Sequence, residues 1–112
     1  MVPDYSETEL TEEEFNEILN NSHEVVVVNF FAEWCIPCLM LTPVLDDLAE
    51  QMDNVKFLKL NIEENEVISS RHKVSSVPCL VIFKKGKEVG RMIGNHSYEI
   101  IEEKIKVHVN NG

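Results

Sequence analysis

Two cysteines three positions apart are the residues of this sequence best suited to chemistry. They belong to the stretch Cys35-Ile36-Pro37-Cys38, which directly follows Trp34. Two sulfurs at this spacing can close a small ring, so the pair can pass between dithiol and disulfide without refolding of the chain. If a helix begins just beyond Cys35, the partial positive charge of its N-terminus favours the thiolate, the species that attacks disulfides. The spacing therefore predicts thiol–disulfide exchange.

The positions of the two cysteines predict different roles. Cys35 precedes the helix, so we expect it to be the more exposed sulfur and the attacking nucleophile. Cys38 lies one turn into the helix and is expected to resolve the mixed disulfide by attacking Cys35. Pro37 would stiffen the loop between the sulfurs, and Trp34 would offer a flat apolar wall to a substrate. The alternative is half of a zinc site, but the sequence has neither a second Cys-x-x-Cys nor a paired histidine motif.

The composition is that of one soluble globular domain over residues 1–112, with 44% apolar and 27% charged residues. A net charge of −10 disfavours nucleic acid and anionic membranes as partners. We expect no signal peptide, because residues 1–10 hold three acidic side chains and no apolar core. The apolar runs are too short for a membrane span. Three cysteines do not make a disulfide scaffold at this size, so we expect the chain to lie in the reducing cytoplasm. We also expect it to be a monomer.

Hydrophobic periodicity and turn residues predict the elements that must position the cysteines. Helices are expected from Thr11, in a capping box with Glu14, to about Leu19; from the cysteine pair to about Gln51, with a kink near Pro43; over Glu63 to His72; and from Ser97 to about Val109. Strands are expected over Val25 to Phe31, Val55 to Leu60, Cys79 to Phe83 and Lys87 to Ile93, with an irregular connection from Val74 to Pro78.

This order of elements predicts an α/β fold with a central mixed β-sheet and helices on both faces. The first strand, helix and strand form a parallel unit, and the last two strands form a hairpin that adds antiparallel strands to the same sheet. The hairpin turn falls at Lys84-Lys85-Gly86, where Gly86 can take a positive φ. Residues 1–6 and 110–112 are expected to fray.

The residues around the cysteine pair resemble a known family. The stretch from Phe30 to Cys38 is similar to the active-site signature of thioredoxins, Trp-Cys-Gly-Pro-Cys. Further matches at the family's spacing are Lys59 to Ile62, Val77-Pro78, Lys84 to Lys87 and Ile93-Gly94. The resemblance covers the chain from about Leu10 to Ile105. A lone Cys-x-x-Cys is a moderate signal, whereas this set of matches in register is specific.

The resemblance implies the thioredoxin fold and a cytoplasmic protein dithiol–disulfide oxidoreductase. Such a protein reduces protein disulfides through a redox-active disulfide, here Cys35-Cys38, and holds no other cofactor and no metal. Electrons would come from a separate donor that is like a thioredoxin reductase. The family's cis-proline would be Pro78, and the backbone of Val77 would pair with an extended substrate peptide. A shallow apolar groove for reductase and substrate would consist of Trp34, Ile36, Val77, Pro78 and Gly94.

Asn29 departs from the family's pattern in a way that bears on the mechanism. Thioredoxins usually have a buried aspartate at this position, under the cysteine pair, where it takes the proton of the resolving cysteine. An amide cannot titrate, so this general base is absent. The family's lysine that pairs with the aspartate is Lys59 here, and it would face an amide oxygen. We expect water or a neutral Lys59 to accept the Cys38 proton and resolution to be slower; alternatively, Asn29 is an ordinary hydrogen-bonded strand residue.

Ile36 and Cys79 are two further departures. Ile36 replaces the usual glycine between the cysteines, where it either shifts the balance between dithiol and disulfide or only adds apolar contact surface. Cys79 stands where thioredoxins commonly have threonine, and it is either a third redox sulfur or a small buried apolar residue. Two alternative functions stay open at this point. One is an oxidant or isomerase of the same fold, and the other is a metal or iron–sulfur module that uses Cys35, Cys38 and Cys79.

Overall fold

The computed structural model describes residues 10–21 and 24–110. In chain order the elements are α1 (Glu12–Asn21), β1 (Val25–Phe31), α2 (Ile36–Gln51), β2 (Val55–Asn61), α3 (Glu66–Arg71), β3 (Cys79–Lys84), β4 (Lys87–Ile93) and α4 (Tyr98–Asn110). The predicted fraying of residues 1–6 and 110–112 lies outside the described residues, apart from the backbone of residue 110. Within the described ranges, no helix has the length and apolar character needed to cross a bilayer.

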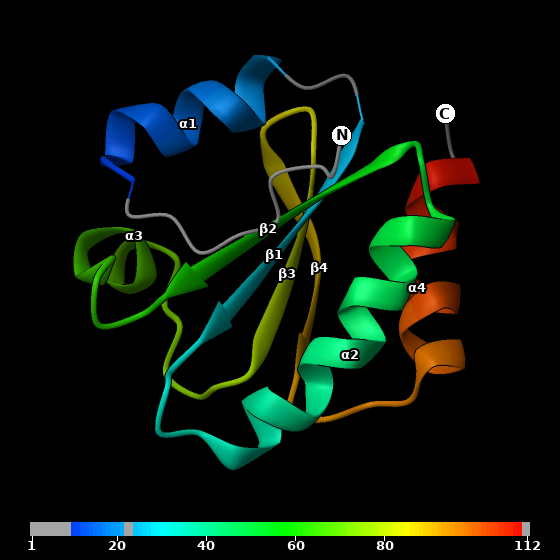
Figure 1. The fold of residues 1–112 in the computed structure, drawn as a ribbon. Helices are drawn as coiled ribbons and strands as arrows, with labels where there is room; N and C mark the ends of the chain where they lie inside the picture. The colour runs from blue at the N-terminus through cyan, green and yellow to red at the C-terminus, as the bar shows by residue number, and fades with distance from the viewer. Residues whose placement is uncertain (1–9, 22–23, 111–112) are drawn as a thin grey trace.

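The four strands form one mixed sheet in the order β2-β1-β3-β4 (Figure 1). Strands β1 and β2 run parallel and are joined through α2, and β3 pairs antiparallel with both β1 and β4. The predicted parallel unit with an added antiparallel hairpin is therefore confirmed. Strand β1 lies inside the sheet and all seven of its residues are buried, as its nearly continuous apolar sequence predicts.

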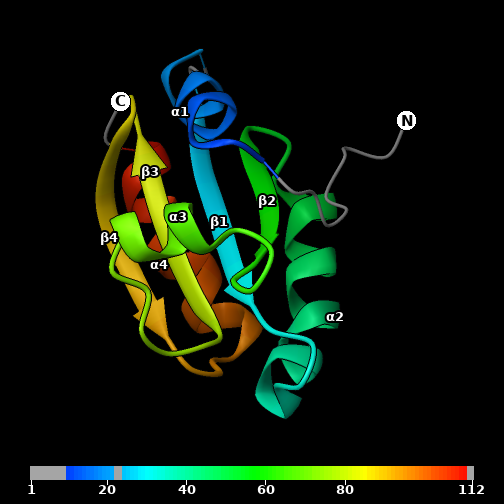
Figure 2. The ribbon, with the colours of Figure 1, turned by 90° about the vertical axis from the view of Figure 1, so that its left-hand side faces the viewer.

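Helices cover both faces of the sheet, as predicted. Alternate side chains of a strand point to opposite faces. Val25 and Val27 of β1 pack in a cluster with Leu41 and Leu45 of α2 and with apolar side chains of α4. Their neighbours along β1 pack on the other face, in a cluster with Phe15 of α1 and residues of α3. Figure 2 shows α1 and α3 in front of the sheet, with α2 and α4 behind it.

Local hydrogen bonds explain where two of the helices begin and end. The predicted capping box is confirmed, because the Glu14 N–H donates to Thr11 Oγ1 at 3.0 Å and the Thr11 N–H donates to Glu14 Oε1 at 2.8 Å. Helix α1 then continues to Asn21, two residues beyond the predicted end. Helix α3 is shorter than predicted, since Asn61 Oδ1 accepts from the Glu63 N–H at 2.8 Å and turns the chain before the helix starts.

The hairpin between β3 and β4 has two residues in its turn with positive φ. They are Lys85, at 54°, and Gly86, at 81°, which are the angles of a two-residue type I′ turn. The positive φ of Gly86 was predicted, whereas that of Lys85 was not. Strands β2 and β3 each extend one residue beyond their predicted ends. Pro43 lies inside α2, which is assigned as one continuous helix, so the kink stays a prediction.

Candidate active site

The start of α2 holds the first cysteine in a defined position. Cys35 is the N-cap residue, with an extended backbone (φ −94°, ψ 107°), and its Sγ accepts a hydrogen bond from the Cys38 N–H at 3.2 Å. Pro37 lies in the first turn, where a missing N–H costs no intrahelical hydrogen bond. The helix therefore begins just beyond Cys35, as predicted. A disulfide joins Cys35 to Cys38, whose Cα atoms are 5.2 Å apart, a usual separation for this bond.

Exposure does not distinguish the two sulfurs in the disulfide form. Cys35 is 4% exposed and Cys38 is 3% exposed, so the structure does not show the greater exposure expected of Cys35. The surroundings of the two residues differ instead. Cys35 Sγ lies at the N-terminus of α2 and 3.7 Å from the carbonyl oxygen of Val77. Cys38 lies inside the helix, and its carbonyl oxygen accepts from Thr42 Oγ1 at 3.1 Å.

The connection before β3 brings a second segment to the disulfide. The Val77–Pro78 peptide bond is cis, as the resemblance implied. Val77 packs against the cluster formed by Phe31, Ala32 and the two cysteines. The Gly94 N–H donates to the carbonyl oxygen of Pro78 at 2.9 Å. Gly94 has φ 90°, and apart from its two chain neighbours no described residue has an atom within 4 Å of the place where a Cβ would lie, so the surface above it is open.

Trp34 lies on the surface beside the disulfide, with 65% of the residue exposed. Its Nε1–H donates to Glu63 Oε2 at 3.2 Å, so the indole is tied to the segment that follows β2. The sequence interpretation missed Glu63. A signal was present, because β1 and β2 are parallel and the residues that follow two parallel strands meet at the same edge of the sheet.

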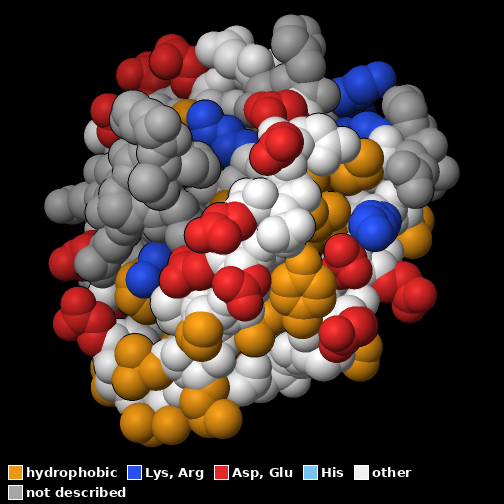
Figure 3. Space-filling view, turned by 45° about the vertical axis from the view of Figure 1, so that its right-hand side comes forward, with side chains coloured by type: hydrophobic (Ala, Val, Ile, Leu, Met, Phe, Trp, Pro, Cys, Tyr) orange, Lys and Arg blue, Asp and Glu red, His pale blue; other side chains and the backbone are white. Residues whose placement is uncertain are grey.

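Exposed apolar side chains surround the disulfide. We call Trp34, Ile36, Leu39, Met40 and Ile93 the active-end surface, and each of these residues is at least 55% exposed. Figure 3 shows apolar side chains gathered at the lower end of the molecule, where Figure 1 places the start of α2, with acidic side chains across the face above. Leu39 and Met40 belong to the first turns of α2, where Figure 1 shows the helix reaching past the ends of the strands.

Asn29 and Lys59 are neighbours on β1 and β2 but do not pair as expected. They are register partners, and alternation along the strands places both on the face covered by α2. Asn29 is 2% exposed, and its Oδ1 has no hydrogen-bond partner among the described residues. The Lys59 Nζ lies over the Phe31 ring, 4.9 Å from its centroid. The expectation that Lys59 faces the amide oxygen is wrong, since its Nζ lies over the Phe31 ring and Asn29 Oδ1 has no partner among the described residues.

Cys79 lies on the opposite face of the sheet from the disulfide. It is 1% exposed and belongs to the cluster beneath α1 and α3, where burial raises the pKa of its thiol. It is therefore a small buried apolar residue rather than a third redox sulfur. The three cysteines do not gather into one metal site within the chain. In the part of the chain that the structure describes, no group of three or more His, Cys, Asp or Glu side chains could hold a metal ion.

Comparison with known proteins agrees with the geometry of the site. The family model described as Thioredoxin matches residues 6–107 of this chain. The chain belongs to the thioredoxin family. It is 45% identical over 84 residues to the thioredoxin of Chlamydia pneumoniae, which covers 75% of this chain and 82% of that protein. It is 36% identical over 101 residues to the thioredoxin of Rickettsia bellii, covering 89% and 96% of the two chains.

Comparison with solved structures supports the same family. The crystal structure of thioredoxin from Trypanosoma brucei brucei matches with a TM-score of 0.88 at 25% identity, covering 98% of this chain and 95% of that one. Family membership, the mixed sheet and the Cys35–Cys38 disulfide together make this chain a protein thiol–disulfide oxidoreductase. Of the residues predicted for the site, Val77 is brought to Cys35, Gly94 to Pro78, and Asn29 to the sheet face under α2.

Proposed function

We propose that this thioredoxin-family chain reduces protein disulfides, with Cys35 as the attacking sulfur and Cys38 as the resolving sulfur. The Cys35 thiolate attacks one sulfur of a substrate disulfide, forms a mixed disulfide and releases the other substrate sulfur as a thiolate. The Cys38 thiolate then attacks Cys35 Sγ, which breaks the mixed disulfide and releases the second substrate thiolate. Two electrons pass to the substrate, and the chain is left as the Cys35–Cys38 disulfide.

The position of Cys35 Sγ at the N-cap of α2 carries this assignment. A sulfur that accepts a hydrogen bond from the Cys38 N–H at 3.2 Å, in the positive field of a helix N-terminus, is stabilised as a thiolate. Cys38 lies inside the same helix and gains less from that field, because the effect falls off within the first turn. The nucleophile is therefore Cys35.

The surroundings of Cys35 support a protein as the substrate. An extended segment that carries the substrate disulfide pairs with the backbone of Val77 and lies in the groove of Trp34, Ile36, Val77, Pro78 and Gly94. The active-end surface extends this groove with further apolar area for a protein partner. A net charge of −10 speeds encounter with partners that carry basic patches.

The electron supply and the location complete the proposal. The chain works as a cytoplasmic monomer without a bound cofactor or metal, and it takes electrons from a separate reductase that resembles a thioredoxin reductase. The same surface beside the disulfide serves reductase and substrate in turn, because both must bring their sulfurs to Cys35. The chain then acts as an electron carrier between two proteins.

Trapping of the mixed disulfide tests the roles of the two sulfurs. Reduced Cys38→Ser is mixed with insulin, and we expect a covalent complex on non-reducing gels, because Cys35 attacks but nothing resolves the product. Reduced Cys35→Ser is the matched control and is expected to form no complex under the same conditions. A complex with Cys35→Ser and none with Cys38→Ser would reverse the assignment.

Equilibration against glutathione buffers tests the direction of the reaction. A reductant has a reduction potential below that of cytosolic glutathione, which lies at roughly −220 to −320 mV. We expect the Cys35–Cys38 couple to lie within or below this range and the wild-type chain to reduce insulin. A couple at about −120 mV, the value of a strong oxidant, would instead assign oxidation to this chain.

A further inference from the structure

The connection between α3 and β3, residues 72–78, carries backbone that contacts the disulfide. The Val77 carbonyl oxygen lies 3.7 Å from Cys35 Sγ, on the side from which a substrate segment pairs. The connection leaves α3 through Lys73, which has a φ of 57°, an angle that non-glycine residues rarely adopt. The Val74 N–H then donates to the Ser69 carbonyl oxygen at 2.9 Å. The path of the chain at its start therefore helps to set where Val77 lies.

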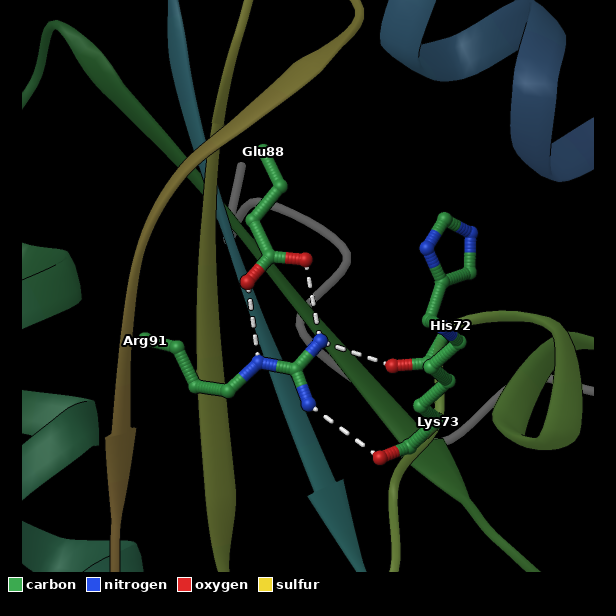
Figure 4. A network of polar contacts seen from close by, with 4 residues as sticks. All are labelled: His72, Lys73, Glu88 and Arg91. Carbon is green, nitrogen blue, oxygen red and sulfur yellow. Dashed lines mark hydrogen bonds and ion pairs between the residues drawn. The ribbon is translucent and has the colours of Figure 1, made fainter.

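Arg91 of β4 binds the start of this connection (Figure 4). Its Nη2 donates to the carbonyl oxygen of His72 at 2.7 Å, and its Nη1 donates to that of Lys73 at 3.3 Å. These carbonyls come at the C-terminal end of α3, where backbone oxygens lack helical partners and a cation is favourable. A single side chain thus holds two successive peptide units.

Glu88 fixes the direction of the Arg91 guanidinium. Arg91 Nε donates to Glu88 Oε2 and Arg91 Nη2 donates to Glu88 Oε1, both at 2.9 Å. Such a bidentate pair sets the plane of the guanidinium as well as its position. The side chain of Arg91 is 25% exposed, so water screens the group less than it screens a surface ion pair. The pair therefore aims Arg91 at the two carbonyls.

Strand β4 holds the end of the same connection as well. The Gly94 N–H, three residues beyond Arg91, donates to the Pro78 carbonyl oxygen at 2.9 Å. Strand β4 also pairs with β3, which follows the connection directly. The two ends of residues 72–78 are thus tied to β4 and to the residue that directly follows it, and Val77 lies between the two points of attachment. Loss of the first attachment frees the chain on one side of Val77 only.

We propose that Arg91 is a positioning residue for substrate: it holds the His72 and Lys73 carbonyls so that the Val77 backbone stays in place beside Cys35. The inference rests on the proposed function, because it needs a substrate segment that pairs with Val77. A small disulfide that reacts at Cys35 without pairing does not need this backbone. Arg91 therefore acts on protein substrates and leaves the chemistry of the two sulfurs unchanged.

Arg91→Met tests the inference with two substrates. Methionine keeps an unbranched side chain with a bulk similar to that of the aliphatic part of arginine, and it removes the guanidinium. We expect kcat/KM for insulin reduction to fall about tenfold, mainly through a higher KM, because weaker ground-state and transition-state binding both follow from a displaced Val77. The rate of reaction of the reduced protein with Ellman's reagent, a small aromatic disulfide, is expected to change by less than about twofold.

Two further variants give the controls. Arg71→Met removes an arginine at the end of α3 that, among the described residues, pairs with Glu12 alone, in a surface ion pair, and it should leave both reactions as in the wild type. Arg91→Lys keeps the charge but lacks the fork of donors, and it should recover part of the loss with insulin. Arg91→Lys also decides the question if Arg91→Met does not fold.

The pattern of results separates this inference from the proposed function. If the Arg91 variants lower both reactions equally, or lower neither, Arg91 does not position substrate and the inference fails. If the wild-type chain does not react with Ellman's reagent, the proposed function fails instead. A selective loss with insulin, absent in Arg71→Met, supports both.

Discussion

Asn29 and Arg91 are polar residues on opposite faces of the same sheet, and their hydrogen bonding is opposite too. Asn29 lies under α2 near the disulfide, and its Oδ1 has no partner among the described residues. Arg91 lies on the face of α1 and α3, where it binds Glu88 and the carbonyls of His72 and Lys73. One face thus keeps an unsatisfied polar atom, and the other satisfies a charged group.

The difference separates stability from reactivity. A buried oxygen without a partner costs about 1–3 kcal/mol, so it is expected where a group serves chemistry rather than folding. The Asn29 amide faces the helix that carries both cysteines. The hydrogen bonds of Arg91 stabilise the fold and hold a connection in place. The two faces of the sheet therefore have different roles. Substitutions of these polar groups on the two faces should change the free energy of unfolding in opposite directions.

Removal of the two polar groups should change stability in opposite directions. Arg91→Met loses hydrogen bonds to a carboxylate and two carbonyls, and we expect the free energy of unfolding to fall by about 2 kcal/mol. Asn29→Leu replaces the unsatisfied amide by an apolar side chain of similar shape, and we expect it to rise by about 1 kcal/mol. Urea unfolding of the oxidised proteins measures both. A loss of stability in Asn29→Leu would show that Oδ1 is satisfied in solution and would end the contrast.

Asn29→Asp should speed the resolution step. A carboxylate under the cysteine pair can accept the Cys38 proton, and general bases contribute at least about 10²-fold when proton transfer limits the rate. We expect a smaller gain of about tenfold near pH 7, because we expect proton transfer to limit the wild-type rate only in part. Stopped-flow measurement of insulin reduction from pH 6 to 9 gives the profile. An unchanged rate across this range would mean that proton transfer was never limiting and that Asn29 is an ordinary strand residue.

His72 lies on the same sheet face as Arg91, and it should make the free energy of unfolding depend weakly on pH. Its ring makes edge contacts with Phe15 and Phe83, with centroids 5.4 and 5.3 Å away. Burial lowers the pKa of His72 from its usual 6.5, and Arg91 lowers it further, while Glu88 opposes the shift. Because the folded state binds the proton less readily, the stabilisation is present above pH 6.5. It is lost as the pH falls from 6.5 through the folded-state pKa.

Comparison with His72→Phe isolates this effect. The variant keeps an aromatic ring between Phe15 and Phe83 and cannot titrate. Between pH 7.5 and 5.5, we expect the free energy of unfolding to fall further in the wild type than in the variant. The expected difference is less than about 1 kcal/mol. Urea midpoints at a series of pH values measure the difference. Parallel curves for the two proteins would show that His72 does not contribute.

The fold could be predicted because local patterns and long-range packing agree in this chain. The apolar run of β1 predicts a covered strand with the bounds Val25–Phe31 that the structure has. Thr11 and Glu14 predict the start of α1 through hydrogen bonds between near neighbours. The predicted start of α3 was wrong, since the Asn61 side chain binds backbone that a helix would otherwise use. Such competition between a side chain and a helix has no signature in hydrophobic periodicity.

The candidate site could be predicted only in part. Cys35 and Cys38 are near in sequence, so their spacing indicates that the two sulfurs can join in a disulfide. The Trp34–Glu63 hydrogen bond joins residues that are 29 positions apart, so its only sequence signal is the expected parallel pairing of β1 and β2, which does not say which side chains meet. Helical spacing has a further limit, because it predicts which side chains share a face but not which of them stay exposed, as Leu39 does at 58%.

The sequence by itself determined the reactive pair, the order of the elements and the family, because the first two depend on residues close together along the chain and the third on the spacing of motifs along it. Tertiary structure alone decided which partners the polar side chains meet. It left the Asn29 oxygen without a partner among the described residues, placed Lys59 over Phe31 and aimed Arg91 at the connection beside Cys35. The physical reason is that a hydrogen bond or ion pair needs its atoms within a few ångströms, and only the packed sheet sets those distances.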